Sequence, residues 1–91
     1  MRILKYALAL GDEVHVRLPE GAEVLTVGAQ DNVLQLWTLV DPAEKVMAKR
    51  TFRIAGTGHE IAEGHQKRYI GTAFTHGGSL VWHVFECLPD F

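Results

Sequence analysis

Polar turns interrupt this chain before any apolar segment grows long enough for a stable helix of several turns. Between the turns, short stretches are rich in β-branched and aromatic residues, and some alternate strictly, as in Glu13–Leu18, "EVHVRL". Alternation with a period of two residues is typical of a strand with one buried face. The breaks that separate these stretches are Pro19–Gly21, Gln30–Asn32, Asp41–Glu44 and Thr75–Gly78. The pattern therefore predicts an all-β chain.

The same pattern predicts where the strands lie. The expected strands are Arg2–Leu10, Glu13–Leu18, Ala22–Ala29, Val33–Val40, Lys45–Ile54, Lys67–Phe74 and Ser79–Leu88. We expect Ala22–Ala29 and Val33–Val40 to pair as a hairpin, and the leucine-rich Val33–Val40 to be buried on both faces. In the irregular segment Ala55–Gln66 we expect at most one helical turn, at Glu60–Glu63. The expected fold is one compact, mainly antiparallel domain over residues 1–91, a sandwich or partly open barrel of about seven short strands.

Length and charge narrow the classes of function. Nine Lys and Arg against eleven Asp and Glu give a net charge of −2, so the chain lacks the positive charge that tracks a long nucleic acid. The single cysteine, Cys87, fits a reducing cytoplasm. The longest segment without a formal charge, Tyr69–Phe85, contains two glycines in its middle and predicts a hairpin rather than a membrane span. Because a domain of 91 residues has a small core and open strand edges, we expect a homo-oligomer, a symmetric dimer or a multiple of it.

The segment Ile54–Ile61, "IAGTGHEI", places two glycines, a threonine and a histidine directly after a strand. Gly56 and Gly58 allow a positive φ and a close approach of the backbone. One interpretation is an anion site, in which backbone N–H groups, the Thr57 hydroxyl and the His59 imidazole donate to phosphate oxygens. The other is a tight turn that needs glycine for its geometry alone. The segment lacks the Lys-Ser/Thr pair of a P-loop and the third glycine of a dinucleotide fingerprint.

Basic residues gather on both sides of this segment. Four of the nine Lys and Arg residues bracket it, namely Arg50, Arg53, Lys67 and Arg68. Guanidinium groups bind phosphate or carboxylate through paired hydrogen bonds, so the cluster favours a small anion. The alternative is a charged sheet edge that discourages the addition of another strand. Alternation along Lys45–Ile54 also makes Arg50 the odd member of an otherwise apolar row.

Aromatic residues supply the second part of a possible nucleotide site. Trp37, Tyr69 and Trp82 could stack on a base, while the alternative for each is packing in the core. Tyr69 is the strongest candidate for stacking because it directly follows Lys67 and Arg68. The predicted ligand-binding residues are thus Arg50, Arg53, Gly56, Thr57, Gly58, His59, Lys67, Arg68, Tyr69 and Trp37.

Metal binding and catalysis are not indicated by the residue spacing. His59 and His65 share one loop, but no cysteine pair or His-Glu-x-x-His pattern accompanies them, and we expect neither a metal nor a cofactor. His83, in "LVWHVF", is expected to be a hydrogen-bonded histidine on a partly buried strand face. Ser79 is the only serine and lies in a glycine-rich turn, and Cys87 has no cationic neighbour in the sequence. The chain is therefore not expected to be an enzyme.

Three strings within Leu18–Glu86 carry a resemblance to a family. They are "LPEGAEVLTVGAQDNVLQLWTLVDP", "RTFRIAGTGHEI" and "YIGTAFTHGGSLVWHVFE", of which "GTGH" and "HVFE" are the most specific parts. The chain resembles a family of small phage- and prophage-encoded proteins that has no established chemistry to transfer. By analogy of size and genome context, the resemblance suggests phage anti-defence sponges of the anti-CBASS and anti-Thoeris kind, which bind signalling nucleotides in oligomers without cleaving them.

Two hypotheses of function follow. The first is a cytoplasmic phage protein, acting in the host cell, that sequesters a small nucleotide immune signal of the cyclic oligonucleotide or cyclic ADP-ribose type. In it, basic residues and "GTGH" hold the phosphates and Tyr69 or Trp37 stacks on a base. The second is a protein-interaction module that inhibits a host or phage protein by direct contact, with "GTGH" as a structural turn.

Overall fold

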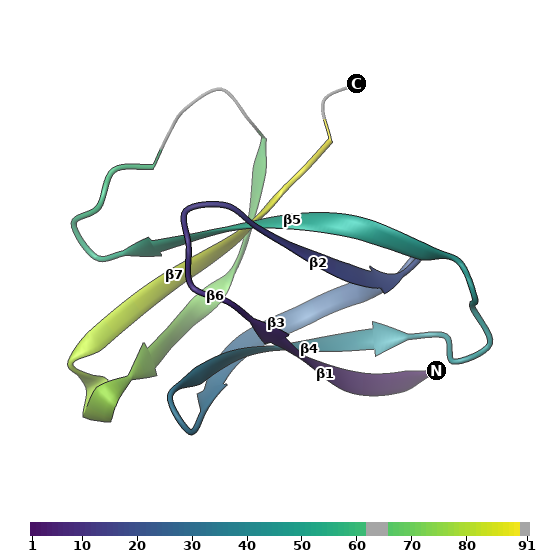
Figure 1. Ribbon diagram of the computed structural model, residues 1–91, viewed down its shortest axis with the longest axis horizontal. Coiled ribbons are helices and arrows are strands. Elements are labelled where there is room, and N and C mark those ends of the chain that lie inside the picture. The colour runs from purple at the N-terminus through teal and green to yellow at the C-terminus, as the bar shows by residue number, and fades with distance from the viewer. Residues whose placement is uncertain (62–65, 90–91) are drawn as a thin grey trace.

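The computed structural model describes residues 1–61 and 66–89, and in that part of the chain seven strands form two antiparallel sheets (Figure 1). The strands are β1 (Arg2–Leu8), β2 (Val14–Pro19), β3 (Glu23–Gln30), β4 (Val33–Val40), β5 (Met47–Gly56), β6 (Lys67–Thr75) and β7 (Leu80–Cys87). A short 3-10 turn, η1 (His76–Gly78), joins the last two. The predicted all-β class is confirmed. The helical turn expected at Glu60–Glu63 runs into residues outside those described.

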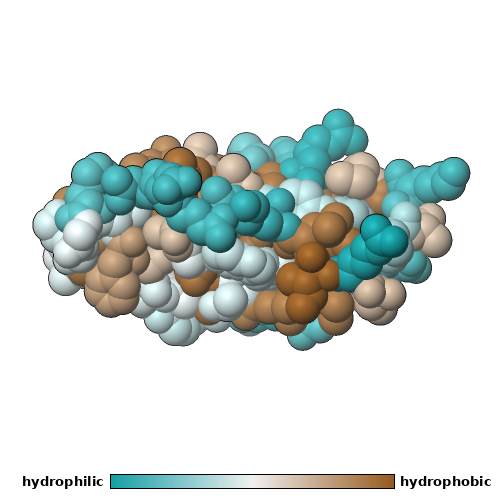
Figure 2. All heavy atoms as spheres, turned by 90° about the horizontal axis from the view of Figure 1, so that it is seen from below, coloured by the Kyte–Doolittle hydropathy of each residue, from teal (hydrophilic) through white to brown (hydrophobic). Residues whose placement is uncertain are grey.

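The two sheets form a thin slab. The first has the strand order β1-β4-β3 and the second β2-β5-β7-β6, and β3 lies beside β6 without closing a barrel. The principal extents of 39 × 33 × 15 Å fit two layers, since packed sheets lie about 10 Å apart. Figure 2 views the slab edge-on from the side of β1 and shows an apolar patch on an otherwise mostly polar edge. Among the described residues, no helix has the length and apolar character needed to cross a membrane.

The predicted β3–β4 hairpin is confirmed, and its turn chemistry explains it. Gln30 pairs with Val33, so only two residues form the turn, and both have a positive φ: 51° at Asp31 and 63° at Asn32. Two consecutive left-handed residues are the geometry of a type I′ turn, which Asp and Asn tolerate better than other side chains. The local sequence thus fixes the register of the β3–β4 hairpin next to the turn.

The core lies between the sheets and is filled by alternate residues of each strand. On β4, Leu34, Leu36 and Val40 are buried, whereas Gln35 and Trp37 on the other face are half-buried. The expectation that β4 is buried on both faces is therefore wrong. The strand is central in its sheet, but its outer face has no third layer to cover it.

An ion pair interrupts the apolar inner face of the second sheet. Arg50 of β5 makes two hydrogen bonds with the Glu86 carboxylate of β7, from Nε to Oε2 and, at 2.9 Å, from Nη2 to Oε1. Its Nη1 donates to the Ala22 carbonyl at 2.7 Å. The Glu86 side chain is only 7% exposed, so this bidentate pairing stabilises a carboxylate that would otherwise be costly to bury. Arg50, the odd member of the apolar row predicted from the sequence, thus has Glu86 as its partner.

Arg68 extends the same contact between the sheets. It stands opposite Glu86 in the β6–β7 register, and its Nη2 donates to the Val24 carbonyl of β3 at 2.7 Å. Arg50 and Arg68 thus each bind a backbone carbonyl at the start of β3 from the second sheet. We call Arg50, Arg68 and Glu86 the inter-sheet cluster.

We predict that Glu86→Ala destabilises the fold far more than loss of an arginine on the outer face. The substitution leaves Arg50 without its carboxylate, and removal of one partner of a buried pair typically costs about 3–5 kcal/mol. Because Arg50 is 22% exposed, we expect the lower end, about 3 kcal/mol in urea unfolding. The control Arg53→Ala should change the unfolding free energy by about 0.5 kcal/mol or less. Equal losses in the two variants would contradict the structural role of the cluster.

Candidate functional site

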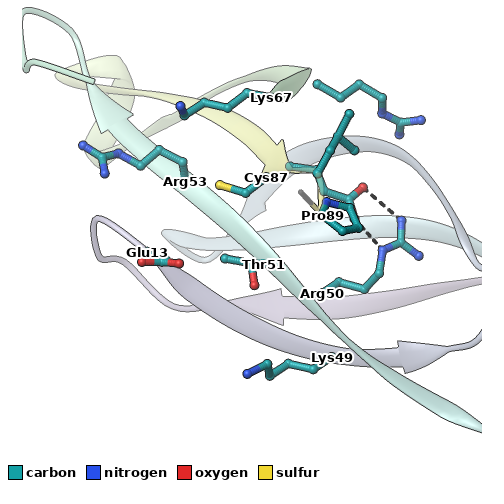
Figure 3. Close-up of a pocket in the computed structure, with 11 residues that line it drawn as sticks. Glu13, Lys49, Arg50, Thr51, Arg53, Lys67, Cys87 and Pro89 are labelled. Atoms are coloured by element: carbon teal, nitrogen blue, oxygen red, sulfur yellow. Dashed lines mark hydrogen bonds and ion pairs between the residues drawn. The ribbon is translucent and has the colours of Figure 1, made fainter. Parts of the chain in front are cut away.

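A groove of about 570 Å³ opens on the outer face of the second sheet (Figure 3). Strands β5, β6 and β7 supply most of its walls, and the chain after β7 closes one side. Its lining residues are Glu13, Lys49, Arg50, Thr51, Arg53, Lys67, Arg68, Glu86, Cys87, Leu88 and Pro89. Pockets that bind small molecules commonly have volumes of about 300–1,000 Å³, so the groove is large enough for a ligand of nucleotide size.

Strand alternation decides which side chains lie on the outer face of the second sheet. One row of directly paired residues crosses β5, β7 and β6 at Thr51, Cys87 and Lys67. The next row on the same face lies two residues further along each strand and consists of Arg53, Phe85 and Tyr69. Phe52 and Glu86, between these rows, are buried on the inner face. The two rows therefore share the outer face, and Arg53, Lys67 and Tyr69 lie on it together.

Positive charge dominates the outward-facing part of the groove. Lys49, Arg53 and Lys67 line it, and within residues 1–61 and 66–89 Glu13 is the acidic residue that borders it from the outer side. In Figure 3, Arg53 and Lys67 lie at the same end of the groove, near the Cys87 thiol. The Arg53 Nη2 donates to the Glu60 carbonyl at 3.3 Å, while its Nε is buried and has no hydrogen-bond partner in the described part of the chain.

Cys87 lies between these cations and is not activated by them. Burial raises the pKa of the Cys87 thiol, and the opposing effect of nearby Lys67 and Arg53 does not cancel it. A thiol with a raised pKa stays protonated near neutral pH, and the thiolate is the nucleophilic form. The sequence shows no cation beside Cys87, whereas the structure brings two close, but the chemical conclusion is the same.

The inter-sheet cluster borders the groove from the inner side. Arg50 and Arg68 are among its lining residues, but their guanidinium groups are held by Glu86 and by the Ala22 and Val24 carbonyls. These two predicted phosphate ligands therefore hold the walls in place while Arg53 and Lys67 face outward.

The "GTGH" segment forms a tight turn beyond the end of the groove. The His59 N–H donates to the Gly56 carbonyl at 3.0 Å, and Gly58 has a φ of +88°. A positive φ at the third of four residues is what a type II turn requires. Gly56 lies under the His59 ring, which would come within 2.8 Å of an added Cβ. Both glycines are thus explained by the geometry of the turn, without a ligand.

A small hollow of about 180 Å³ lies between this turn and the start of β7. Its lining residues are Gly56, Thr57, His59, Ser79, Leu80, Val81 and Trp82. None of these is Lys or Arg. The groove, not the hollow, is therefore the better candidate for an anion.

A chain of hydrogen bonds connects the turn to Tyr69 across the outer face. The Thr57 hydroxyl lies 2.8 Å from His83 Nε2, His83 Nδ1 lies 3.1 Å from the Thr72 hydroxyl, and that hydroxyl lies 2.5 Å from the Tyr69 hydroxyl. The prediction that His83 is a hydrogen-bonded strand histidine is confirmed. We call Thr57, His83, Thr72 and Tyr69 the hydroxyl–imidazole chain.

Sequence reasoning missed this chain because of a β-bulge. Tyr69 and Thr72 are three residues apart, and in a regular strand they would point to opposite faces. The register shifts between Tyr69 and Gly71, which leaves Ile70 as the extra residue and puts Thr72 on the face of Tyr69. The one sequence signal for that bulge is Gly71, because glycine within a strand often marks a bulge. In the structure Gly71 also lies close to Val27, since an added Cβ would come within 3.1 Å of that side chain.

Trp37 does not join the other predicted residues. It lies on the outer face of the first sheet, where its ring covers Gly28 so closely that an added Cβ would be 3.0 Å from Trp37 Cζ3. It belongs to the layer opposite the groove. Of the predicted ligand residues, the structure thus brings Arg53, Lys67 and Tyr69 together on one surface, places Arg50 and Arg68 behind it, and separates Trp37 from them.

Comparison with known proteins assigns the family. Residues 1–90 match the model of the family described as Domain of unknown function (DUF7352). The chain belongs to this family. Neither the curated proteins nor the solved structures gave a match. The description of the family names no activity.

We predict that the two glycines of "GTGH" respond differently to alanine. Gly58→Ala places a side chain at a φ of +88° and should cost about 1–2 kcal/mol of unfolding free energy. Gly56→Ala meets only the end of the exposed His59 side chain, which can rotate away, so its cost should be about 0.5 kcal/mol or less. Thermal unfolding followed by circular dichroism measures both. A Gly58→Ala protein as stable as wild type would contradict the type II turn.

Proposed function

We propose that this protein binds a small phosphate-bearing signal of the nucleotide class in the groove and holds it without cleaving it. The observation that carries the proposal is the convergence of Lys49, Arg53 and Lys67 on one groove of about 570 Å³, although the whole chain has a net charge of −2. Ammonium and guanidinium groups bind phosphate oxygens by charge-assisted hydrogen bonds. A local cationic site on a mildly acidic protein favours a small anion over a long polyanion.

The chemistry of the groove favours binding over turnover. Of the described residues that line it, none is a histidine, and its thiol, Cys87, has a raised pKa. Nucleophilic catalysis needs a nucleophile with an adjacent base or a lowered pKa. A ligand held by Lys and Arg alone would leave the site unaltered.

Sequestration of an immune signal is the biological role that fits such a site best. The resemblance to small phage-encoded proteins supports a phage anti-defence protein in the host cytoplasm, and a cyclic oligonucleotide or a cyclic ADP-ribose derivative would be its ligand. A sponge acts by stoichiometry, so an oligomer that carries several grooves would suit the role. The proposal includes a homo-oligomer, a dimer or a multiple of it.

The second candidate function is inhibition of another protein by direct contact. It is favoured by the apolar edge at β1, where Met1, Ile3 and Leu4 are 74%, 58% and 42% exposed. An edge strand with exposed apolar side chains offers both backbone pairing and apolar contact to a partner. Under this alternative the groove would bind no ligand and would result only from the packing around the inter-sheet cluster.

We predict that Arg53→Ala and Lys67→Ala each weaken the binding of signalling nucleotides by roughly tenfold or more, because a hydrogen bond to a charged group contributes about 1.5–3 kcal/mol. The matched control is Arg2→Ala, an exposed arginine on the first sheet, which should bind as wild type does. Isothermal titration against a panel of cyclic and linear nucleotides measures the affinities.

The bound nucleotide should also be recovered chemically unaltered after the protein is heat-denatured. Recovery of a hydrolysed product would make the protein an enzyme. If no nucleotide in the panel binds and a protein partner is captured through the β1 edge, the second function replaces the first.

A further inference from the structure

The hydroxyl–imidazole chain lies next to the groove and is not used by the binding of phosphate. Its last member, Tyr69, follows Lys67 by two residues on the same strand and shares the outer face with it. Tyr69 also shares a register row with Arg53, with Phe85 between them. Since neighbouring strands are about 4.8 Å apart, Arg53 and Tyr69 stand about 10 Å from each other, a distance that one nucleotide can span.

Tyr69 has the properties of a stacking platform rather than of a core residue. It is 56% exposed, and its ring meets that of Phe85 in a tilted arrangement with 5.4 Å between the centroids and 55° between the planes. The contact with Phe85 supports one side of the ring and leaves the exposed part for a ligand. Aromatic side chains held in this way are the surfaces on which bases stack in nucleic-acid-binding proteins.

The chain fixes the orientation of that ring. An exposed tyrosine would ordinarily sample several rotamers, but the hydroxyl of Tyr69 is held 2.5 Å from Thr72, and Thr72 is held in turn by His83. The second nitrogen of His83 is bonded to Thr57 in the "GTGH" turn. A ring that is already oriented loses less conformational entropy when a ligand binds.

We propose that Tyr69 binds the base of the ligand and that His83 is the positioning residue that holds it there, so that the site selects nucleotides over phosphates that lack a ring. This inference rests on the proposed function, since the phosphate of the same ligand occupies the groove. It gives the "GTGH" turn a role one step removed from the ligand, because Thr57 anchors His83 and does not itself bind phosphate.

The tautomer of His83 decides which end of the hydroxyl–imidazole chain has a free hydroxyl hydrogen. A neutral imidazole has one donor and one acceptor nitrogen. If Nδ1 of His83 donates to Thr72, the Thr72 hydroxyl donates to Tyr69, and the phenol hydrogen is free to point toward the ligand. In the other tautomer the phenol donates back to Thr72 and the free hydroxyl hydrogen is at Thr57.

The test compares ligands with and without a base on the same proteins. Binding of the four ribonucleoside monophosphates and of ribose phosphate is measured by isothermal titration for wild type, Tyr69→Ala, His83→Ala and Thr72→Val. We expect wild type to prefer the nucleotides, and Tyr69→Ala to lose roughly fivefold or more of that preference with unchanged binding of ribose phosphate. His83→Ala and Thr72→Val should reduce the preference in the same direction, and Thr72→Ser, which keeps the hydroxyl, should restore it.

A matched control variant separates the positioning role of His83 from a general effect of losing a strand histidine. His15 is also a strand histidine bonded to a threonine, since its Nδ1 lies 3.0 Å from the Thr51 hydroxyl, but it takes no part in the chain. His15→Ala should keep the full preference for nucleotides. If wild type binds ribose phosphate as tightly as the nucleotides, this inference fails and the proposed function stands. If wild type binds none of these phosphates, this inference fails, and the titration against cyclic and linear nucleotides decides the proposed function separately. If His83→Ala and Thr72→Val keep the preference that Tyr69→Ala loses, the positioning role of His83 is overturned.

Discussion

The ion pair between Arg50 and Glu86 is the contact on which the geometry of the outer face depends. Both residues point inward from neighbouring strands, and Arg50 also reaches the Ala22 carbonyl just before β3. The pairing satisfies a carboxylate that is almost fully buried, and together with Arg68 it fixes how the start of β3 meets the second sheet. Because residues along a strand alternate, the same strands that turn this cluster inward must turn Arg53 and Cys87 outward.

The candidate site follows from that alternation and from one departure from it. The regular part gives two rows on the outer face, one with Lys67 and one with Arg53 and Tyr69. The bulge at Ile70 then brings Thr72 to the same face, and with it the link to His83. A groove with cations at one end and an oriented aromatic ring beside it is a surface with two chemically different parts. Nucleotides combine the same two chemistries, a phosphate and a planar base.

Much of the fold follows from local sequence. The breaks at Pro19–Gly21 and Gln30–Asn32 lie where the chain turns, and the alternation of β5 correctly identifies Arg50 as the odd residue of an apolar row. The same alternation places Arg50 and Arg53 on opposite faces of the second sheet.

Other parts of the site depend on contacts between distant segments. Glu86 lies 36 residues from Arg50, and nothing in the sequence pairs them before the β5–β7 register is known. The opposite placement of Trp37 requires knowing that β4 belongs to the first sheet. The bulge that aligns Thr72 with Tyr69 is likewise a property of the paired strands. Local periodicity cannot report on these features because each is decided by which strands become neighbours.

The outer face of the second sheet, and not the "GTGH" turn itself, is the proposed binding surface for the ligand. Titration of the labelled protein with a nucleoside monophosphate, followed through its backbone amide NMR shifts, tests this most directly. The account predicts that the largest shift changes fall in residues 49–53, 67–69 and 85–87, the segments that line the groove and carry Tyr69 and Phe85. Largest changes at Trp37 and its neighbours on the first sheet, or at Gly56–His59 with none in the groove, would contradict it.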